Sequence, residues 1–241
     1  MPKAKYNEIY RDLKTKIENE EYEFQELLPS ENTLINTYDC SRNTIRRAIA
    51  ALVTDGYVQT MQGKGVRNIF QPTLQASFTI GGIESFKESA IRNHQTPRTE
   101  VLCFTELTAD KKISKKTGFP IGSSLYYLQR LHFLDDKALI LNHNYFLKDV
   151  VTNLTPEIAE DSIYEYLENT LHISIITSKR IMTVEKMTQI DEKYLELGDY
   201  NCLAVVSSQT YNSDGIMFEY TQSRHRPDYF RFQDNATRRT V

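Results

Sequence analysis

The chain has few cysteines and no long hydrophobic run, and both features narrow the class of protein. Its three cysteines, Cys40, Cys103 and Cys202, lie far apart and show no metal-ligand spacing, so we expect reduced thiols in a cytoplasm. No apolar stretch approaches the roughly 20 residues that a membrane-spanning helix needs. The charged, amphipathic N-terminus does not resemble a signal peptide. The sequence therefore predicts a cytoplasmic protein with no membrane span.

Short motifs of catalysis are also missing. The sequence contains no nucleophile elbow, P-loop, HExxH or CxxC, and its five histidines show no metal-ligand spacing with one another or with cysteine. Serine, histidine and acidic residues are present, but no pattern brings them together as a catalytic group. We therefore expect no enzymatic activity, no metal and no cofactor.

The net charge of −3 does not by itself indicate a nucleic-acid-binding protein, but the charges are unevenly distributed. Residues 18–31 contain six glutamates and no lysine or arginine. Residues 41–70 contain five basic residues against one acid, Asp55. With 241 residues and 40% hydrophobic residues, the chain is long enough for two modest globular domains. The basic stretch has the size of one recognition element.

The first 70 residues read as helices followed by a small hairpin. Apolar residues recur at helical spacing from Tyr6 to Ile17, and Ser30 and Ser41 are suited to cap two further helices. The second of these should end near Asp55-Gly56. Two short strands should follow, on either side of a Gly63-Lys64-Gly65 turn. This order predicts a winged helix-turn-helix.

The helix that follows Ser41 has two unlike faces. Its apolar face runs from Ile45 to Val53, and its other face carries Asn43, Arg46 and Arg47. Arginine and asparagine side chains can reach purine edges in the major groove, where such a helix docks. By itself the helix could also be an ordinary solvated amphipathic one. The capping serines, the turn and the basic wing, in this order, favour a DNA-binding domain.

The remainder of the chain changes in pattern after a linker at 71–77. We expect strands at 101–108, 124–134, 138–146, 174–188, 202–211 and 216–232, and helices at 84–92, 110–117, 162–170 and 191–197. Successive strands with inserted helices predict an α+β domain with a mixed, mostly antiparallel sheet. The expected division is thus 1–70, 71–77 and 78–241.

Polar side chains gather on the predicted strands of this second domain. Arg130 and His132 share one strand face, and the next strand returns Asn142. The spacing E-x3-S-x2-R-x-D falls on Glu219, Ser223, Arg226 and Asp228. Basic side chains on such a sheet can bind an anionic ligand such as a sugar phosphate. Plain ion pairing within the sheet, for example of Arg226 with Asp228, is the alternative.

The stretch LLPSENTLINTYDCSRNTIRRAIAALVTDGYVQTMQGKGV resembles the DNA-binding domain of the GntR family of bacterial transcription regulators. The shared patterns are L-P-S-E, S-R-x-T-[VI]-R-x-A and a Gly-x-Gly wing, over about residues 6–70. One departure is Asn32, where the family usually has an arginine. The resemblance implies double-stranded operator DNA as partner, contacted by Ser30, Glu31, Ser41, Arg42, Asn43, Thr44, Arg46, Arg47, Gly63, Lys64 and Gly65.

The second domain carries ESF at residues 84–86, Arg130 and His132 in place of R-x-R, Asn142 after ALIL in place of an acid, and E-x3-S-x2-R-x-D. By these features residues 78–241 resemble the UTRA (chorismate-lyase-like) effector-binding domain of the HutC branch of this family. Three segments are similar to the trehalose-responsive members of the family: GGIESFKE, SRHRPDYFRFQDNATRR and the wing at 62–65. This similarity implies a small sugar phosphate, trehalose 6-phosphate, as effector. Gly81 and Gly82 are expected near its phosphate. The effector-binding residues implied are Ser85, Phe86, Arg130, His132, Asn142, Thr177, Lys179, Glu219, Ser223, His225 and Arg226.

These resemblances lead to an expected function, a repressor that is released from its operator by the sugar phosphate. Two half-sites related by a two-fold axis call for a homodimer. Three alternatives stay open: a sugar-phosphate enzyme with an appended DNA-binding domain, a family member that responds to another phosphorylated sugar, and an activator of transcription.

Overall fold

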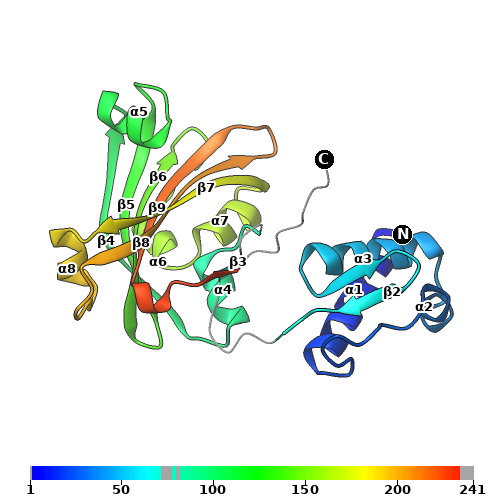
Figure 1. Cartoon of the computed structure of the whole chain (residues 1–241). Coiled ribbons are helices and arrows are strands. Elements are labelled where there is room, and N and C mark those ends of the chain that lie inside the picture. The colour runs from blue at the N-terminus through cyan, green and yellow to red at the C-terminus, as the bar shows by residue number, and fades with distance from the viewer. Residues whose placement is uncertain (1, 72–77, 80–81, 234–241) are drawn as a thin grey trace. The chain divides into compact units, whose positions relative to one another are not determined.

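A computed structural model describes residues 2–71, 78–79 and 82–233. These residues form two compact units, one ending at residue 71 and the other beginning at residue 78 (Figure 1). Residues 72–77 of the expected linker, and Gly81, lie outside the described residues. The domain boundaries 1–70, 71–77 and 78–241 are therefore kept as a proposal.

The first unit is a winged helix-turn-helix, as the sequence predicted. It consists of α1 (Pro2–Glu18), α2 (Glu31–Tyr38), α3 (Arg42–Thr54), β1 (Val58–Met61) and β2 (Gly65–Asn68). Ser30 and Ser41 cap α2 and α3, each accepting a hydrogen bond from the backbone three residues on. Helix α3 ends before Gly56, whose φ of 76° is the left-handed conformation that glycine adopts readily. Apolar residues of α1, α2 and α3, including Leu13, Leu34 and Leu52, form one core.

The wing is an antiparallel pair held by its turn and by one buried side chain. The Lys64 amide donates to the Met61 carbonyl, and Gly63 and Gly65 have φ values of 70° and 109°. Asn68, which is 2% exposed, donates through Nδ2 to the carbonyls of Tyr22 and Glu23. These bonds fix the wing to the segment between α1 and α2, so the Gly-Lys-Gly tip extends from an anchored base.

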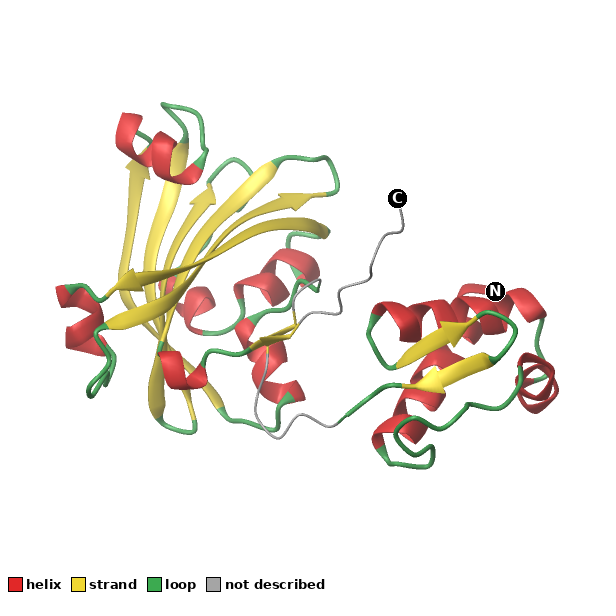
Figure 2. Ribbon diagram, viewed as in Figure 1, coloured by secondary structure: helices red, strands yellow, loops and turns green. Residues whose placement is uncertain are grey.

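The second unit is built on one six-stranded sheet with the strand order β4-β5-β6-β9-β8-β7 (Figure 2). Every neighbouring pair in it is antiparallel, which confirms the α+β prediction. The strands are β4 (Pro97–Thr108), β5 (Ser124–Leu134), β6 (Lys137–Leu147), β7 (Ile175–Lys186), β8 (Cys202–Asn212) and β9 (Met217–His225).

Helices cover the two faces of this sheet unequally. One face carries α4 (Phe86–Arg92), α6 (Pro156–Glu160) and α7 (Ile163–Asn169), which pack on it through apolar side chains such as Leu167. On the other face, α5 (Lys111–Thr117) and α8 (Gln189–Tyr194) pack over separate patches. Figure 1 shows α5 and α8 at opposite ends of the strands. Polar side chains on the first face can therefore lie between sheet and helices.

The expected strand 216–232 is too long. Strand β9 ends at His225, and a 3₁₀ turn, η1 (Pro227–Tyr229), follows because Pro227 has no amide hydrogen to continue the ladder. A two-residue parallel pair, β10 (Phe232–Gln233) with β3 (Phe78–Thr79), comes after it and is the parallel part of a mostly antiparallel fold. Helix α6 was not expected, because five residues show no periodicity.

Candidate functional site

Two exposed arginines of α3 contact polar side chains in the first turn of α2. The Arg46 Nε lies 2.8 Å from a carboxylate oxygen of Glu31, the first residue of α2. Arg42 donates from Nη2 to Oδ1 of Asn32 at 3.0 Å. Arg42 and Arg46 are four residues apart and so share one face of α3. Glu31 and Asn32 therefore orient the two guanidinium groups. An arginine at position 32, as is usual in the family, has no acceptor and could not receive the hydrogen bond from Arg42.

Arg47 has a different environment. Its guanidinium lies 4.2 Å from the ring centroid of Tyr6 in α1, a cation–π contact. One residue along a helix turns the side chain by about 100°, so Arg47 does not share the face of Arg46. Asn43 remains exposed on α3. All the expected DNA contacts stay predictions.

The wing exposes Gly63, Lys64 and Gly65. A Cβ added at either glycine would meet nothing within 4 Å, so the backbone conformation and not space requires glycine there. Arg67 donates to the Gln25 carbonyl at 2.9 Å and so helps to hold the base of the wing. Lys64 is thus the cation that the tip of the wing presents.

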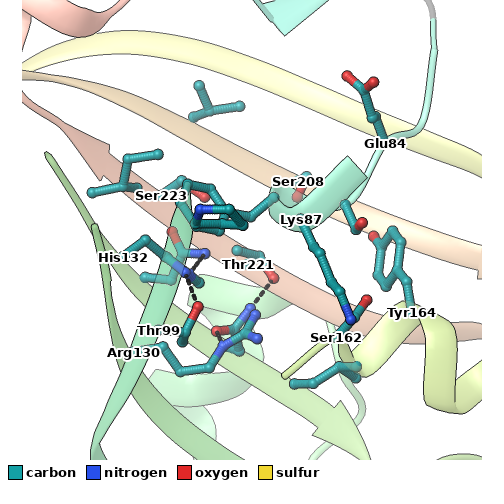
Figure 3. A pocket seen from close by; sticks show the side chains of 18 of the residues that line it. Glu84, Lys87, Thr99, Arg130, His132, Ser162, Tyr164, Ser208, Thr221 and Ser223 are labelled. Atoms are coloured by element: carbon teal, nitrogen blue, oxygen red, sulfur yellow. Dashed lines mark hydrogen bonds between the residues drawn. The ribbon is translucent and has the colours of Figure 1, made fainter. Parts of the chain in front are cut away.

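The second unit contains a pocket of about 240 Å³ between the sheet and α4, α6 and α7. In Figure 3, Arg130, His132 and Thr99 lie on one side of it, and Tyr164 and Lys87 lie on the other. The structure brings eight of the expected effector-binding residues to its lining: Ser85, Phe86, Arg130, His132, Asn142, Glu219, Ser223 and His225.

Arg130 is a buried charge without a carboxylate partner. It donates from Nε to Asn144 Oδ1 at 3.0 Å and from Nη1 to the Ala159 carbonyl at 3.4 Å. No described carboxylate lies within 4 Å of its guanidinium, whereas buried Arg224 on the opposite face pairs with Asp191 at 2.8 Å. Burial lowers the pKa of Arg130 to about 10, so it stays charged at neutral pH. Such a group favours an anion in the pocket.

A chain of hydrogen bonds links Arg130 to the carboxylate of Glu219. Asn144 donates to Thr221 Oγ1, and Thr221 donates to Glu219 Oε1, both at 2.7 Å. Tyr164 donates to the other oxygen, Oε2, at 2.7 Å. The nearby negative charge of Glu219 opposes the fall in the Arg130 pKa without neutralising the guanidinium directly. Glu219 thus organises the hydroxyl groups beside the anion position.

His132 lies at the centre of a neutral polar group. Thr99 Oγ1 lies 2.9 Å from its Nδ1, and Asn142 Nδ2 lies 2.8 Å from its Nε2. Burial lowers the pKa of His132 well below its ordinary value, and the charge of Arg130 adds to this effect. Burial likewise lowers the pKa of His225 to about 3. Both rings are therefore neutral at physiological pH.

Charged side chains from α4 and β7, Lys87 and Arg180, also line the pocket. Lys87 contacts Asp161 at 2.7 Å and Glu165 at 3.0 Å. Arg180 donates from Nη2 to the Gly82 carbonyl at 2.7 Å, which ties the segment before α4 to the sheet. The hydroxyl oxygen of Ser85 accepts from the Glu88 amide, so its own hydrogen can point to a ligand.

Three expected effector-binding residues lie outside the pocket. Side chains alternate along a strand, and in β7 Ser178 and Arg180 line the pocket. Thr177 and Lys179 lie on the opposite face, where Lys179 Nζ is 5.1 Å from the centroid of the Tyr211 ring. Thr177 and Lys179, which the resemblance implied for the effector site, are therefore absent from the lining, and their neighbours Ser178 and Arg180 are part of it.

Arg226 is the third. It follows β9 and makes two hydrogen bonds to the Asp228 carboxylate, from Nε at 3.1 Å and from Nη2 at 2.8 Å. Arg226 is thus ion-paired within the fold, as the alternative interpretation expected. Of the residues in the E-x3-S-x2-R-x-D pattern, only Glu219 and Ser223 line the pocket.

Several lining residues escaped the sequence reasoning. Asn144 and Thr221 could have been found from the two-residue period of strands, since they share a face with Asn142 and Glu219. Thr99 and Tyr164 gave no such signal, because their place depends on how distant elements pack. The lining side chains described above that were not predicted are Lys87, Thr99, Asn144, Tyr164, Ser178, Arg180 and Thr221.

Within the described ranges, no three histidine, cysteine, aspartate or glutamate side chains are grouped as metal ligands. None of the described helices has the length and apolar character needed to cross a bilayer.

Comparison with known proteins gives two family matches and close relatives. Residues 5–67 match the family of bacterial regulatory proteins described as gntR, and residues 92–231 match the UTRA domain. The HTH-type transcriptional regulator TreR of Bacillus subtilis is 35% identical over 234 residues, covering 97% of this chain and 98% of its own. The regulator GmuR of the same organism is 27% identical, with coverages of 94% and 95%.

The similar solved structures are also of transcriptional regulators. The effector-binding domain of the B. subtilis trehalose repressor is 34% identical, with a TM-score of 0.54, and covers 59% of this chain and 99% of that domain. YydK of B. subtilis, described as a possible transcriptional regulator, has a TM-score of 0.82 with coverages of 97% and 99%. At 20% identity, this second likeness concerns the fold alone.

Proposed function

Because the chain belongs to the GntR family of bacterial transcription regulators and carries the UTRA domain of its HutC branch, we propose that trehalose 6-phosphate releases it from operator DNA. The chain is a transcriptional repressor of the GntR and UTRA type. The alternative of a sugar-phosphate enzyme has no counterpart among the relatives described above, which are named as regulators. The proposed place of action is the cytoplasm, where the operator DNA is.

The single observation that carries the effector proposal is the buried, unpaired charge of Arg130 in a pocket rich in hydroxyl groups. A phosphate accepts the forked donors of arginine, and the neighbouring serine, threonine and tyrosine side chains suit sugar hydroxyls. The likeness to the B. subtilis trehalose repressor supports a trehalose-derived ligand over other phosphorylated sugars.

Direct binding tests this assignment. In isothermal titration calorimetry of the full chain, trehalose 6-phosphate should bind at least about tenfold more tightly than trehalose, since a charge-assisted hydrogen bond contributes about 1.5–3 kcal/mol. The sugars differ only in the group that Arg130 is proposed to meet. Equal affinities would contradict the phosphate-anchored site, and binding of neither sugar would remove trehalose 6-phosphate as the effector.

A homodimer is the second part of the proposal, and β7 is the surface proposed for it. This strand is an edge of the sheet, so along its twelve residues one side lacks a hydrogen-bonded neighbour among the described strands. Ile176, Ile181 and Val184 are 59%, 67% and 75% exposed there. An exposed apolar edge pairs readily with another chain, and the two-fold symmetry of an operator makes a second copy the fitting partner.

Replacing Ile181 and Val184 with aspartate should therefore give a monomer that binds operator poorly, because each head then binds its half-site alone. Sedimentation of the full chain at micromolar concentration measures this. Ile121→Asp is the matched control, since Ile121 is 66% exposed in the loop before β5, away from the edge. A double variant that still sediments as a dimer would rule out β7 as the interface.

A further inference from the structure

Asn32 and Arg42 connect the two helices of the helix-turn-helix on its exposed surface. Asn32 is the second residue of α2, and Arg42 is the first residue of α3. Arg42 Nη2 donates to Asn32 Oδ1 at 3.0 Å, and both residues are exposed. The first residues of a recognition helix are those that contact base edges in the major groove. A side chain of α2 therefore holds the arginine at the reading end of α3.

The contacts define which edge of the Arg42 guanidinium remains free. Nη2 is bound by Asn32, and Nε lies 3.8 Å from Glu31 Oε1, so the edge formed by Nε and Nη2 faces α2. The terminal edge, formed by Nη1 and Nη2, still has hydrogens to donate. Two parallel donors of this kind match the O6 and N7 acceptors of guanine.

The same hydrogen bond defines how the Asn32 amide is turned. A guanidinium group only donates, so the amide oxygen must face Arg42, and the amide nitrogen must point away from it. None of the described residues accepts a hydrogen bond from Asn32 Nδ2. Beside the terminal edge of Arg42, the protein thus presents a second, uncharged donor.

We propose that Asn32 and Arg42 read two neighbouring base pairs as one unit. Arg42 contacts guanine through its terminal edge. Asn32 fixes that edge in place, and its Nδ2 donates to an acceptor of the adjacent base pair. Asn32 is therefore a specificity-determining residue of this chain. The inference goes beyond the proposed effector and rests only on operator binding by the first unit.

The asparagine changes what is read at the second position. An arginine there, as is usual in the family, would bring paired donors of its own and favour guanine. A single amide nitrogen fits any major-groove acceptor, which is thymine O4 or a purine N7. We therefore expect this position of the half-site to accept more than one base.

Charge separates this role from a contact to phosphate. Glu31 Oε1 lies 2.8 Å from Arg46 Nε and 3.8 Å from Arg42 Nε, so one carboxylate lies between two cations. Asn32 adds no charge to this group. Its loss should leave the salt dependence of binding unchanged, whereas loss of a phosphate-bound cation reduces the slope of log K against log salt by about 1.

Selection from random duplexes by the full chain, without any sugar, tests the pair. Arg42→Ala should relax a preference for guanine in each half-site, and Asn32→Ala should relax the preference at the neighbouring position. Asn32→Ala should weaken the selected operator about three- to tenfold, the effect of one lost hydrogen bond, and leave binding to unrelated DNA unchanged. Asn36→Ala, which removes an exposed amide one turn further along α2, is the control.

Two further measurements separate the two roles of Asn32. Asn32→Arg should narrow the neighbouring position to guanine, because it supplies paired donors. Fluorescence anisotropy of the double variant tests the positioning: Asn32→Ala should cost less affinity when Arg42 is already alanine, since two residues that act as a unit are not additive.

Unchanged sequence selection by Asn32→Ala would overturn the proposal. An equal loss on unrelated DNA with a reduced salt slope would do so too, because it marks a phosphate contact. Additive losses from Asn32→Ala and Arg42→Ala would rule out the joint reading. None of these results bears on trehalose 6-phosphate, since no sugar is present, and failure of the proposed effector leaves the pair standing.

Discussion

Arg130→Met is expected to abolish release of the repressor by trehalose 6-phosphate while operator binding without ligand is unchanged. The substitution replaces the buried guanidinium with an apolar side chain, so the phosphate would be buried without its cation. Two lost charge-assisted hydrogen bonds correspond to a fall in affinity of about 100-fold or more. A ligand shifts a conformational equilibrium only by its difference in affinity for the two states, so release should vanish at ligand concentrations that saturate the parent.

Gel-shift titrations of parent and variant with the sugar phosphate measure this effect. Arg226→Ala and Lys179→Ala are matched controls, because both remove a cation of the same unit that lies outside the pocket. Arg130 also supports Asn144 and the Ala159 carbonyl, so thermal unfolding should show that the variant is folded. Release of Arg130→Met at the ligand concentration that releases the parent would mean that the phosphate binds elsewhere.

Arg46→Ala should weaken specific operator binding by about 1–3 kcal/mol, or roughly 5- to 150-fold, if its guanidinium reads a base. Its partner Glu31 holds it on the exposed face of α3 at 2.8 Å in the free protein. This exposed ion pair contributes little to stability, so the arginine can exchange it for a guanine at small cost. Binding to unrelated DNA should change much less.

Lys64→Ala provides the contrast. A lysine that contacts phosphate should weaken specific and non-specific binding alike and reduce the slope of log K against log salt by about 1. Arg47→Ala is a further comparison, because Arg47 packs on Tyr6 and is turned away from Arg46. Fluorescence anisotropy with specific and random duplexes separates these patterns. If Arg46→Ala binds operator as tightly as the parent does, the placement of the recognition face is wrong.

Local sequence signals were sufficient for the first unit because its elements are defined by neighbouring residues. Ser30 and Ser41 cap helices whose apolar periodicity is visible in the sequence, and Gly63 and Gly65 mark the wing turn. The six strands of the large sheet were also found, because alternation or apolar runs extend over most of their length.

The pocket was only partly predictable, for physical reasons. Arg130 and His132 are two residues apart on one strand, so a shared face follows from the pleat. For β7 only the family resemblance pointed to Thr177 and Lys179, and a shift of one residue exchanges the faces of Thr177 and Ser178. Tyr164 reaches Glu219 from a helix 55 residues earlier in the chain. No local pattern predicts such a contact, because it depends on how α7 packs.

If one chain couples operator DNA to a phosphorylated sugar, each ligand must weaken binding of the other, and a reciprocal titration measures both effects. The full chain is bound to a labelled operator fragment that it has selected from random duplexes, and trehalose 6-phosphate is added while anisotropy is recorded. The affinity for the sugar phosphate is then measured with and without the operator. We expect the sugar phosphate to release the DNA, and each ligand to weaken the binding of the other by one common factor, about 5- to 150-fold. Equal affinity for trehalose 6-phosphate with and without operator would contradict it.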